Sequence, residues 1–168
     1  MGKDVMNVVF LGLGGNMGNR LENLSKTIEA LEKDCGEIIK RSGIYETDAW
    51  GSNSKKKYLN QVVQISTILS PENLLEKLLK IEEKLGRKRS EEQNSDRTVD
   101  IDILFFNADI INSKNLQIPH PRLYSRKFVL IPLTEIANDL VHPILKVTME
   151  ELLKNCKDTL AVKLVKKV

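Results

Sequence analysis

DRTVDIDILFF, residues 96–106, is the stretch of the sequence that decides the fold. Apolar side chains occupy every second position along it: Val99, Ile101, Ile103 and Phe105. This period of two predicts a β-strand whose side chains point to opposite faces of a sheet. Asp100 and Asp102 then share one face, where a spacing of roughly 6–7 Å suits one cation or a pair of cations about 3.5–4 Å apart. Hard carboxylate oxygens of this kind favour magnesium.

Two other interpretations of these aspartates are open at this point. Arg97, at the start of the strand, is placed to meet an anion that a metal recruits, or it forms a surface ion pair of little energetic value. A calcium loop is disfavoured, because Leu104 and Phe105 stand where an EF-hand needs a third oxygen ligand and a glycine. Two charges in so apolar a strand lose hydration unless something compensates them, which favours the metal.

Length and composition indicate one ordinary soluble domain. The 168 residues are 41% hydrophobic and 29% charged, a balance that can bury one core and that excludes general disorder. The net charge of +3 is too small for a dedicated nucleic-acid binder. Cys35 and Cys156 have no metal-site spacing, and no apolar run is long enough to cross a membrane. We expect a cytoplasmic monomer without nucleic-acid or membrane partners.

Periodicity predicts the other elements. Strands are expected at 8–13, 37–45 and 58–67, and helices over 21–35 and from Ser70 to Gly86, where serine and glycine are typical caps. Short strands are expected at 110–111 and 116–118, a core segment at 129–133 and a closing helix at 149–154. His142 is expected in an exposed turn, and the lysine-rich end from Lys157 is expected to be a peripheral tail.

The order strand, helix, strand, strand, helix, strand predicts the fold class. It is that of an α+β protein with a ferredoxin-like βαββαβ core, in which helices pack on one side of an antiparallel sheet. The remaining residues form a C-terminal extension. We expect residues 1–168 to be a single domain with its core at about residues 8–155.

Two loops are candidates for ligand binding. Gly14-Gly15-Asn16, between a strand and a helix, is either a nucleotide-cradling loop or a tight turn, and no Gly-Lys-Ser/Thr follows it. The polar segment 46–57 contains the only tryptophan, Trp50. A loop of about a dozen residues is uncommon unless it is functional or disordered, so this one is either a substrate lid or a mobile hairpin connection.

Charged residues near the aspartate strand add further candidates. Arg87, Arg89 and Arg97 can fork onto phosphate oxygens, although a solvated charge run is the alternative for the first two. Glu82, on the apolar face of its helix, either pairs with a cation or helps to order a site. His120, braced between two prolines, either donates a rigid hydrogen bond or is structural.

Motifs spread over about residues 8–155 occur in the order of a known family. They are Gly14-Gly15-Asn16, Tyr45-Glu46-Thr47, Tyr58-Leu59-Asn60, residues 82–89, RTVDIDIL at 97–104, IPHP at 118–121 and residues 126–133. In these motifs the chain resembles the 6-hydroxymethyl-7,8-dihydropterin pyrophosphokinases of folate biosynthesis. The arginine-aspartate strand with its downstream Pro-His-Pro is the specific part of the signal.

The resemblance implies 2-amino-4-hydroxy-6-hydroxymethyldihydropteridine diphosphokinase activity, the transfer of pyrophosphate from ATP to the hydroxymethyl group of the pterin with release of AMP. It also implies two magnesium ions held by Asp100 and Asp102. The implied catalytic residues are Arg87, Arg97, Asp100 and Asp102. The implied ATP contacts are Arg89, Arg97, His120 and Arg126. The implied pterin contacts are Thr47, Trp50, Tyr58, Asn60 and Phe128.

The chain departs from the family at two places. Many members have Trp-Gly-Pro before the arginine that matches Arg97, where this chain has Asn94-Ser95-Asp96. Prolines commonly follow the glutamate-threonine pair, where this chain has Asp48-Ala49-Trp50.

Two rival functions come from other classes. A metal-dependent phosphodiesterase would need more acidic or histidine ligands near the aspartates. A ferredoxin-like RNA-binding module would need aromatic side chains where Asp100 and Asp102 repel phosphate.

Overall fold

The computed structural model describes residues 4–50, 54–86 and 96–168. Its elements are β1 (Asn7–Gly15), α1 (Arg20–Asp34), β2 (Glu37–Arg41), β3 (Ile44–Thr47), β4 (Tyr58–Thr67), α2 (Pro71–Lys84), β5 (Asp100–Phe106), β6 (Ile111–Asn112), β7 (Gln117–Ile118), α3 (Lys127–Ala137), α4 (Met149–Asn155) and β8 (Val162–Lys166). None of the helices in these ranges is long and apolar enough to cross a bilayer.

The main sheet is antiparallel, and β1 lies in its interior. The strand order is β5-β1-β4-β3-β8, and β2 also pairs with β4. From β1 to β5 the chain has the predicted ferredoxin-like arrangement, because α1 and α2 each connect strands that have another strand between them. The predicted fold class is confirmed. The small hairpin of β6 and β7 forms a separate sheet.

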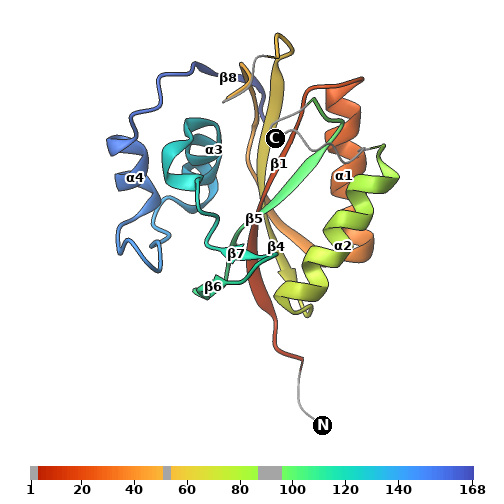
Figure 1. Ribbon diagram of the computed structural model, residues 1–168, viewed down its shortest axis with the longest axis vertical. Helices are drawn as coiled ribbons and strands as arrows, with labels where there is room; N and C mark the ends of the chain where they lie inside the picture. The colour runs from red at the N-terminus through yellow and green to blue at the C-terminus, as the bar shows by residue number, and fades with distance from the viewer. Residues whose placement is uncertain (1–3, 51–53, 87–95) are drawn as a thin grey trace.

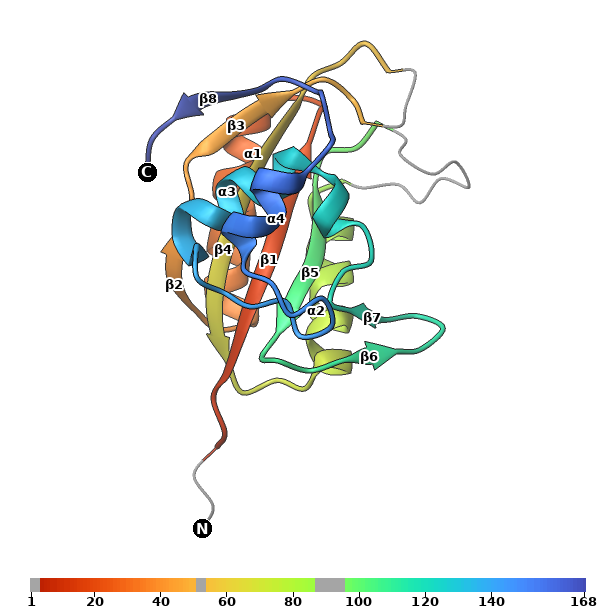
Figure 2. The ribbon, with the colours of Figure 1, turned by 90° about the vertical axis from the view of Figure 1, so that its left-hand side faces the viewer.

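Helices cover both faces of the sheet. Figure 1 shows α1 and α2 on one face and α3 and α4 on the other. Each face has its own buried cluster: Leu11 and Ile103 belong to the cluster under α1 and α2, whereas Phe10 and Leu104 belong to the cluster under α3 and α4. The expectation of helices on one side is correct for the βαββαβ core alone, since the C-terminal extension covers the second face (Figure 2).

A β-bulge interrupts the predicted alternation along β5. The register against β1 shifts between Phe10, which pairs with Phe105, and Leu11, which pairs with Ile103. As a result, Leu104 and Phe105 both pack in the cluster under α3 and α4. The prediction that Phe105 lies on the same face as Ile103 is therefore wrong. Asp100 and Asp102 precede the bulge, so their shared face is unaffected.

Helix boundaries agree with the capping signals. The Ser70 hydroxyl accepts a hydrogen bond from the Asn73 amide at 3.2 Å at the start of α2. Gly86, with φ of 91°, takes up the left-handed conformation just beyond its end. The strand predicted at 37–45 is divided into β2 and β3, and at the break the buried Ser42 hydroxyl accepts a hydrogen bond from the Val62 amide at 2.9 Å.

Two predictions for the C-terminal region are wrong. The end of the chain is no peripheral tail, because β8 pairs with β3 and extends the sheet, with Val162 opposite Thr47. A turn follows at 143–145 and is exposed at Ile144 and Leu145, but His142 itself is only 4% exposed. Its ring packs edge-on against Phe105, with 5.6 Å between the ring centroids, and its Nδ1 accepts the Leu145 amide at 3.1 Å. The apolar segment 129–133 lies in α3 and is buried as predicted, except for Ile131, which is partly exposed.

Candidate active site

The two aspartates of β5 stand beside two glycines of β1. Asp100 pairs with Gly14 and Asp102 pairs with Gly12, and directly opposed residues of antiparallel strands point to the same face. Because glycine has no side chain, the sheet surface next to both carboxylates is open. It forms the floor of a cleft on the α3 side of the sheet.

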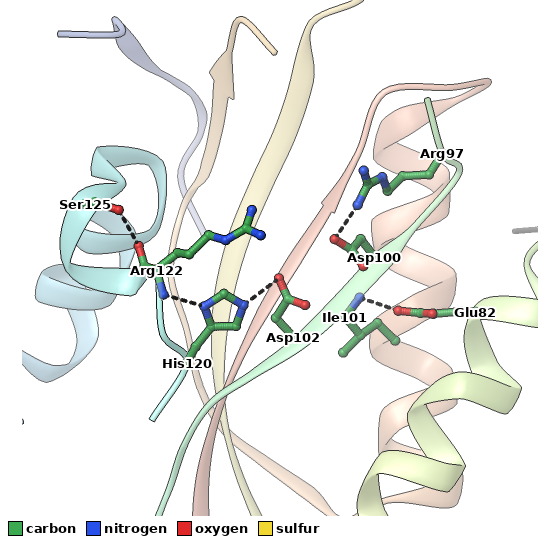
Figure 3. A network of polar contacts seen from close by, with 8 residues as sticks. All are labelled: Glu82, Arg97, Asp100, Ile101, Asp102, His120, Arg122 and Ser125. Carbon is green, nitrogen blue, oxygen red and sulfur yellow. Dashed lines mark hydrogen bonds and ion pairs between the residues drawn. The ribbon is translucent and has the colours of Figure 1, made fainter. Parts of the chain in front are cut away.

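Glu82 of α2 holds the strand segment between the two aspartates. Its side chain is 4% exposed, and its carboxylate accepts a hydrogen bond from the Ile101 amide at 2.8 Å (Figure 3). β5 is at the edge of the sheet, where outward amides need a partner from outside the ladder. Two roles were predicted for Glu82, pairing with a cation or ordering a site. Its hydrogen bond to the Ile101 amide is a contact of the second kind.

Arg97 is fixed at both its backbone and its side chain. Its Nη1 lies 2.8 Å from Asp100 Oδ2. Its amide donates to Asn16 Oδ1 at 2.8 Å, and its carbonyl accepts the Asn16 amide at 2.9 Å. Gly14 and Gly15 lie within β1, so they form neither a nucleotide-cradling loop nor a tight turn. Gly15 instead allows the close approach of Thr98, whose carbonyl oxygen would lie 2.2 Å from a Cβ at this position.

His120 faces Asp102 with one ring nitrogen. Its Nδ1 accepts the Arg122 amide at 3.2 Å. Burial, followed by the positive charges of Arg126 and Arg122, lowers the pKa of His120 to about 4, so the ring is neutral near pH 7. The ring proton is then on Nε2, which lies 3.9 Å from Asp102 Oδ2 (Figure 3). At 3.9 Å this nitrogen makes no hydrogen bond to Asp102, so the predicted role of His120 as a rigid donor stays a prediction.

The cleft on the α3 side brings together most of the predicted site residues. Its lining includes Thr47, Trp50, Tyr58, Asn60, Arg97, Asp100, Asp102, Arg126 and Phe128. They come from three strands, two loops and the start of α3. Arg87 and Arg89 lie outside the described residues, so their predicted roles stay predictions.

A second cavity meets the first one at Asp102. It is open to solvent, and His120 also lines it. The remaining lining residues are Leu75, Ile101, Ile103, Lys114, Asn115, Leu116, Gln117 and Pro121. Asp102 therefore lines both cavities. His120 lines the second cavity, whereas Tyr58 and Asn60 line the first cleft.

An amide and a hydroxyl form the polar end of the first cleft. The Asn60 side chain is 6% exposed, and its Nδ2 donates to Thr47 Oγ1 at 3.0 Å. This contact fixes the orientation of an amide that offers both a donor and an acceptor. Asn60 pairs with Gly14, which places the amide in the same row of the sheet as Asp100.

Arg126 is stacked between two aromatic rings. Its guanidinium carbon lies 4.5 Å from the centroid of Trp50 and 5.5 Å from that of Phe128. Arg126 is 9% exposed, and among the described residues its buried Nε has no hydrogen-bond partner. Such an arginine favours an anionic ligand that can accept from it. Trp50, which was predicted to contact the pterin, here covers this arginine.

The carboxylate pair suits magnesium. In the described ranges, no group of three or more histidine, cysteine, aspartate or glutamate side chains could hold a metal ion. Mg²⁺ commonly keeps several waters and uses one or two carboxylates together with substrate phosphates. The Asp102 side chain is 39% accessible, and it lines both cavities. Partial burial, and then repulsion from Asp100, raise the pKa of Asp102 above its usual range, which a bound cation would reverse.

Sequence reasoning missed two parts of this site. The first is the contact of Asn16 with the backbone of Arg97. The sequence feature that could have indicated a role for Asn16 was its position in the Gly14-Gly15-Asn16 motif. The second is the cavity beside β6 and β7, to which Lys114 and Asn115 contribute from the hairpin turn. The polar residues between two short strands were the available signal, but a turn composition does not say which surface the turn faces.

Comparisons with known proteins identify relatives over most of the chain. The sequence model of one family, described as 7,8-dihydro-6-hydroxymethylpterin-pyrophosphokinase, matches residues 10–138. A 2-amino-4-hydroxy-6-hydroxymethyldihydropteridine pyrophosphokinase of Aquifex aeolicus is 41% identical over 146 residues, which are 87% of this chain and 90% of that protein. The enzyme of the same name from Bacillus subtilis is 42% identical over 135 residues, 80% of each chain.

Some relatives are much longer. The folic acid synthesis protein FOL1 of Dictyostelium discoideum is 36% identical, and the match covers 89% of this chain but 22% of that protein. A solved structure of wild-type Plasmodium falciparum HPPK-DHPS with pteroate has a TM-score of 0.74 at 19% identity, over 92% of this chain and 43% of that one. At this identity the structure supports the fold alone.

Proposed function

This chain belongs to the 7,8-dihydro-6-hydroxymethylpterin-pyrophosphokinase family, and on that premise we propose how its residues divide the work. The activity is transfer of pyrophosphate from ATP to the hydroxymethyl group of 6-hydroxymethyl-7,8-dihydropterin, with release of AMP, in folate biosynthesis. The single observation that supports the division of residues is the position of Asp102, which lines both cavities. We also propose that residues 1–168 act as one domain.

The first cleft is proposed to hold the pterin. Tyr58 and Phe128 both line it and offer aromatic faces to a flat ring. The Asn60 amide, fixed by Thr47, would read the donor and acceptor groups of the pterin edge. A ring bound there would direct its hydroxymethyl group toward the carboxylates on the glycine floor.

The second cavity is proposed to hold the nucleoside part of ATP. Its apolar side chains, such as Leu75 and Ile103, suit a base, and its polar hairpin residues suit a sugar. The triphosphate would then pass His120 and Asp102 toward the first cleft. His120 Nε2, Arg97 and the unsatisfied Nε of Arg126 are placed to donate to it. Arg87 and Arg89 keep this predicted role from the family resemblance.

Two magnesium ions at Asp100 and Asp102 would complete the site. Bound magnesium would neutralise the triphosphate and polarise its phosphoryl oxygens. The protein contributes orientation: Glu82 fixes the backbone between the two carboxylates, and Asn16 fixes the backbone of Arg97. Positioning and charge neutralisation are the main requirements of phosphoryl transfer, and both are properties of this arrangement.

An activity assay tests the proposal directly. The protein is incubated with ATP, magnesium and 6-hydroxymethyl-7,8-dihydropterin, and the nucleotides are separated. We expect AMP in a 1:1 ratio to pterin pyrophosphate and only when all three are present, because the family reaction moves two phosphoryl groups together. ADP as the product, or AMP release without the pterin, would contradict the proposed function.

Arg97→Ala is expected to lower kcat by about 100-fold, since it removes one preorganised donor to the phosphates. The dissociation constant of the pterin is expected to change by less than about threefold, because the Asn60 amide and the two aromatic faces remain. Calorimetry gives the pterin affinity and AMP release gives kcat. Arg41→Ala, an exposed change on β2, is the matched control. Equal losses in kcat and in pterin affinity would overturn this division of roles.

A further inference from the structure

Asp96 joins three segments that lie far apart in the sequence. Its Oδ1 accepts the Asn16 side-chain amide at 2.8 Å, and its Oδ2 lies 3.6 Å from Lys56 Nζ. The Ser54 hydroxyl, then the Asn16 amide and Lys56, hold the pKa of Asp96 below its usual range.

The partners of Asp96 belong to the two sides of the proposed reaction. Ser54 and Lys56 lie in the segment that leads directly into Tyr58, on the pterin side. Asp96 itself immediately precedes Arg97, on the phosphate side. Arg97 also lies over the Tyr58 ring, with 6.0 Å between its guanidinium carbon and the ring centroid. The two segments are therefore in contact at two successive places.

Arg20 holds the same pterin-side segment from the opposite direction. Its Nη1 donates to the Lys57 carbonyl at 3.0 Å, and its Nη2 lies 2.8 Å from Glu46 of β3. The segment 54–57 is thus tied to the sheet at one end and to Asp96 at the other. Because the backbone of segment 54–57 is held at Lys57, we expect a movement of Asp96 to move Lys56 and, through the chain, Tyr58.

We propose that the ion pair of Asp96 with Lys56 positions Arg97 relative to Tyr58, and that this positioning sets how strongly the binding of one substrate favours the binding of the other. Asp96 and Lys56 are positioning residues in this scheme, because neither contacts the reacting atoms. The proposal rests on the proposed function, which assigns the pterin to the Tyr58 side and the triphosphate to the Arg97 side. In this scheme each substrate binds better while the ion pair is formed, and thermodynamic linkage makes the effect of the two substrates on each other reciprocal.

The size of the effect follows from the exposure of the pair. The Lys56 and Asp96 side chains are 57% and 34% exposed, so the interaction is weak and is screened by salt. We expect it to account for about a two- to fivefold change in affinity at each site, which is the range of an exposed charge pair.

The test measures this coupling directly. The pterin dissociation constant is determined by calorimetry with and without a non-hydrolysable ATP analogue and magnesium, and the ratio of the two values is the coupling factor. Lys56→Met and Asp96→Asn are each expected to lower the factor about two- to fivefold, and the double variant no further. Lys56→Arg should keep the factor, and Lys55→Met on the neighbouring exposed lysine is the matched control. Raising the salt concentration should lower the factor in the unaltered protein but not in Asp96→Asn.

The outcomes separate this proposal from the proposed function. AMP release by the unaltered protein, measured in parallel, decides the proposed function alone. If that activity is present, a coupling factor of one in the unaltered protein overturns the coupling role. The same conclusion follows if the single variants keep the full factor, or if their losses add in the double variant.

Discussion

Asp102→Asn is expected to lower kcat for AMP release by about 10³-fold or more, the scale of losing a group that holds a catalytic metal. Asparagine has nearly the shape of aspartate, so the packing of β5 against β1 should persist. The change removes a negative charge where both cavities meet. It also removes the repulsion between Asp102 and Asp100, so the metal-free protein should be at least as stable as before.

Metal binding gives a second measurement of the same variant. In the unaltered protein, magnesium with a non-hydrolysable ATP analogue should raise Tm, because a ligand that binds only the folded state stabilises it. Asp102→Asn should lose most of this increase, and Asp100→Asn should do the same while also removing the negative charge that pairs with Arg97. Asp109→Asn, at an exposed turn beyond β5, is the control. Turnover near normal in Asp102→Asn would refute the metal assignment.

Local sequence patterns predicted those elements whose own residues determine their structure. Ser70 caps α2, and the alternation around Asp100 and Asp102 defines β5. The elements that were predicted wrongly depend on distant partners. The face of Phe105 follows from the register of β1 against β5, and β8 is a strand because β3 offers it an edge. Neither relation has a signature within a short window of sequence.

The site shows the same division between local and distant signals. The family motifs located Thr47, Tyr58 and Asn60, and the structure places all three in one cleft with Asp100. The stacking of Trp50 on Arg126 was not predictable in this way, because it joins a loop to the start of α3 across the cleft. The contacts of Asp96 were missed for the same reason: its partners come from two other loops.

Gly15→Ala is expected to destabilise the protein by about 3 kcal/mol, at the upper end of the range for overpacking. The added Cβ would lie 2.2 Å from the Thr98 carbonyl oxygen and 2.9 Å from its carbonyl carbon. Both are backbone atoms, so no side chain can rotate away, and the end of β1 must separate from the chain entering β5. That separation breaks the paired hydrogen bonds of Asn16 with Arg97, at 2.8 and 2.9 Å, which hold the arginine over the carboxylates.

Thermal unfolding of two glycine variants measures this effect against a matched control. At Gly12, three positions earlier on the same strand, an added Cβ would lie 3.5 Å from Leu104 Cδ2, an ordinary contact distance. Gly12→Ala should therefore leave Tm nearly unchanged, whereas Gly15→Ala should lower it by about 10 °C for a chain of this size. Equal values of Tm for the two variants would show that the start of β5 moves freely. In that case the close approach at Thr98 would not be what positions Arg97, and the fixed geometry of the arginine would have to come from its side-chain contact with Asp100.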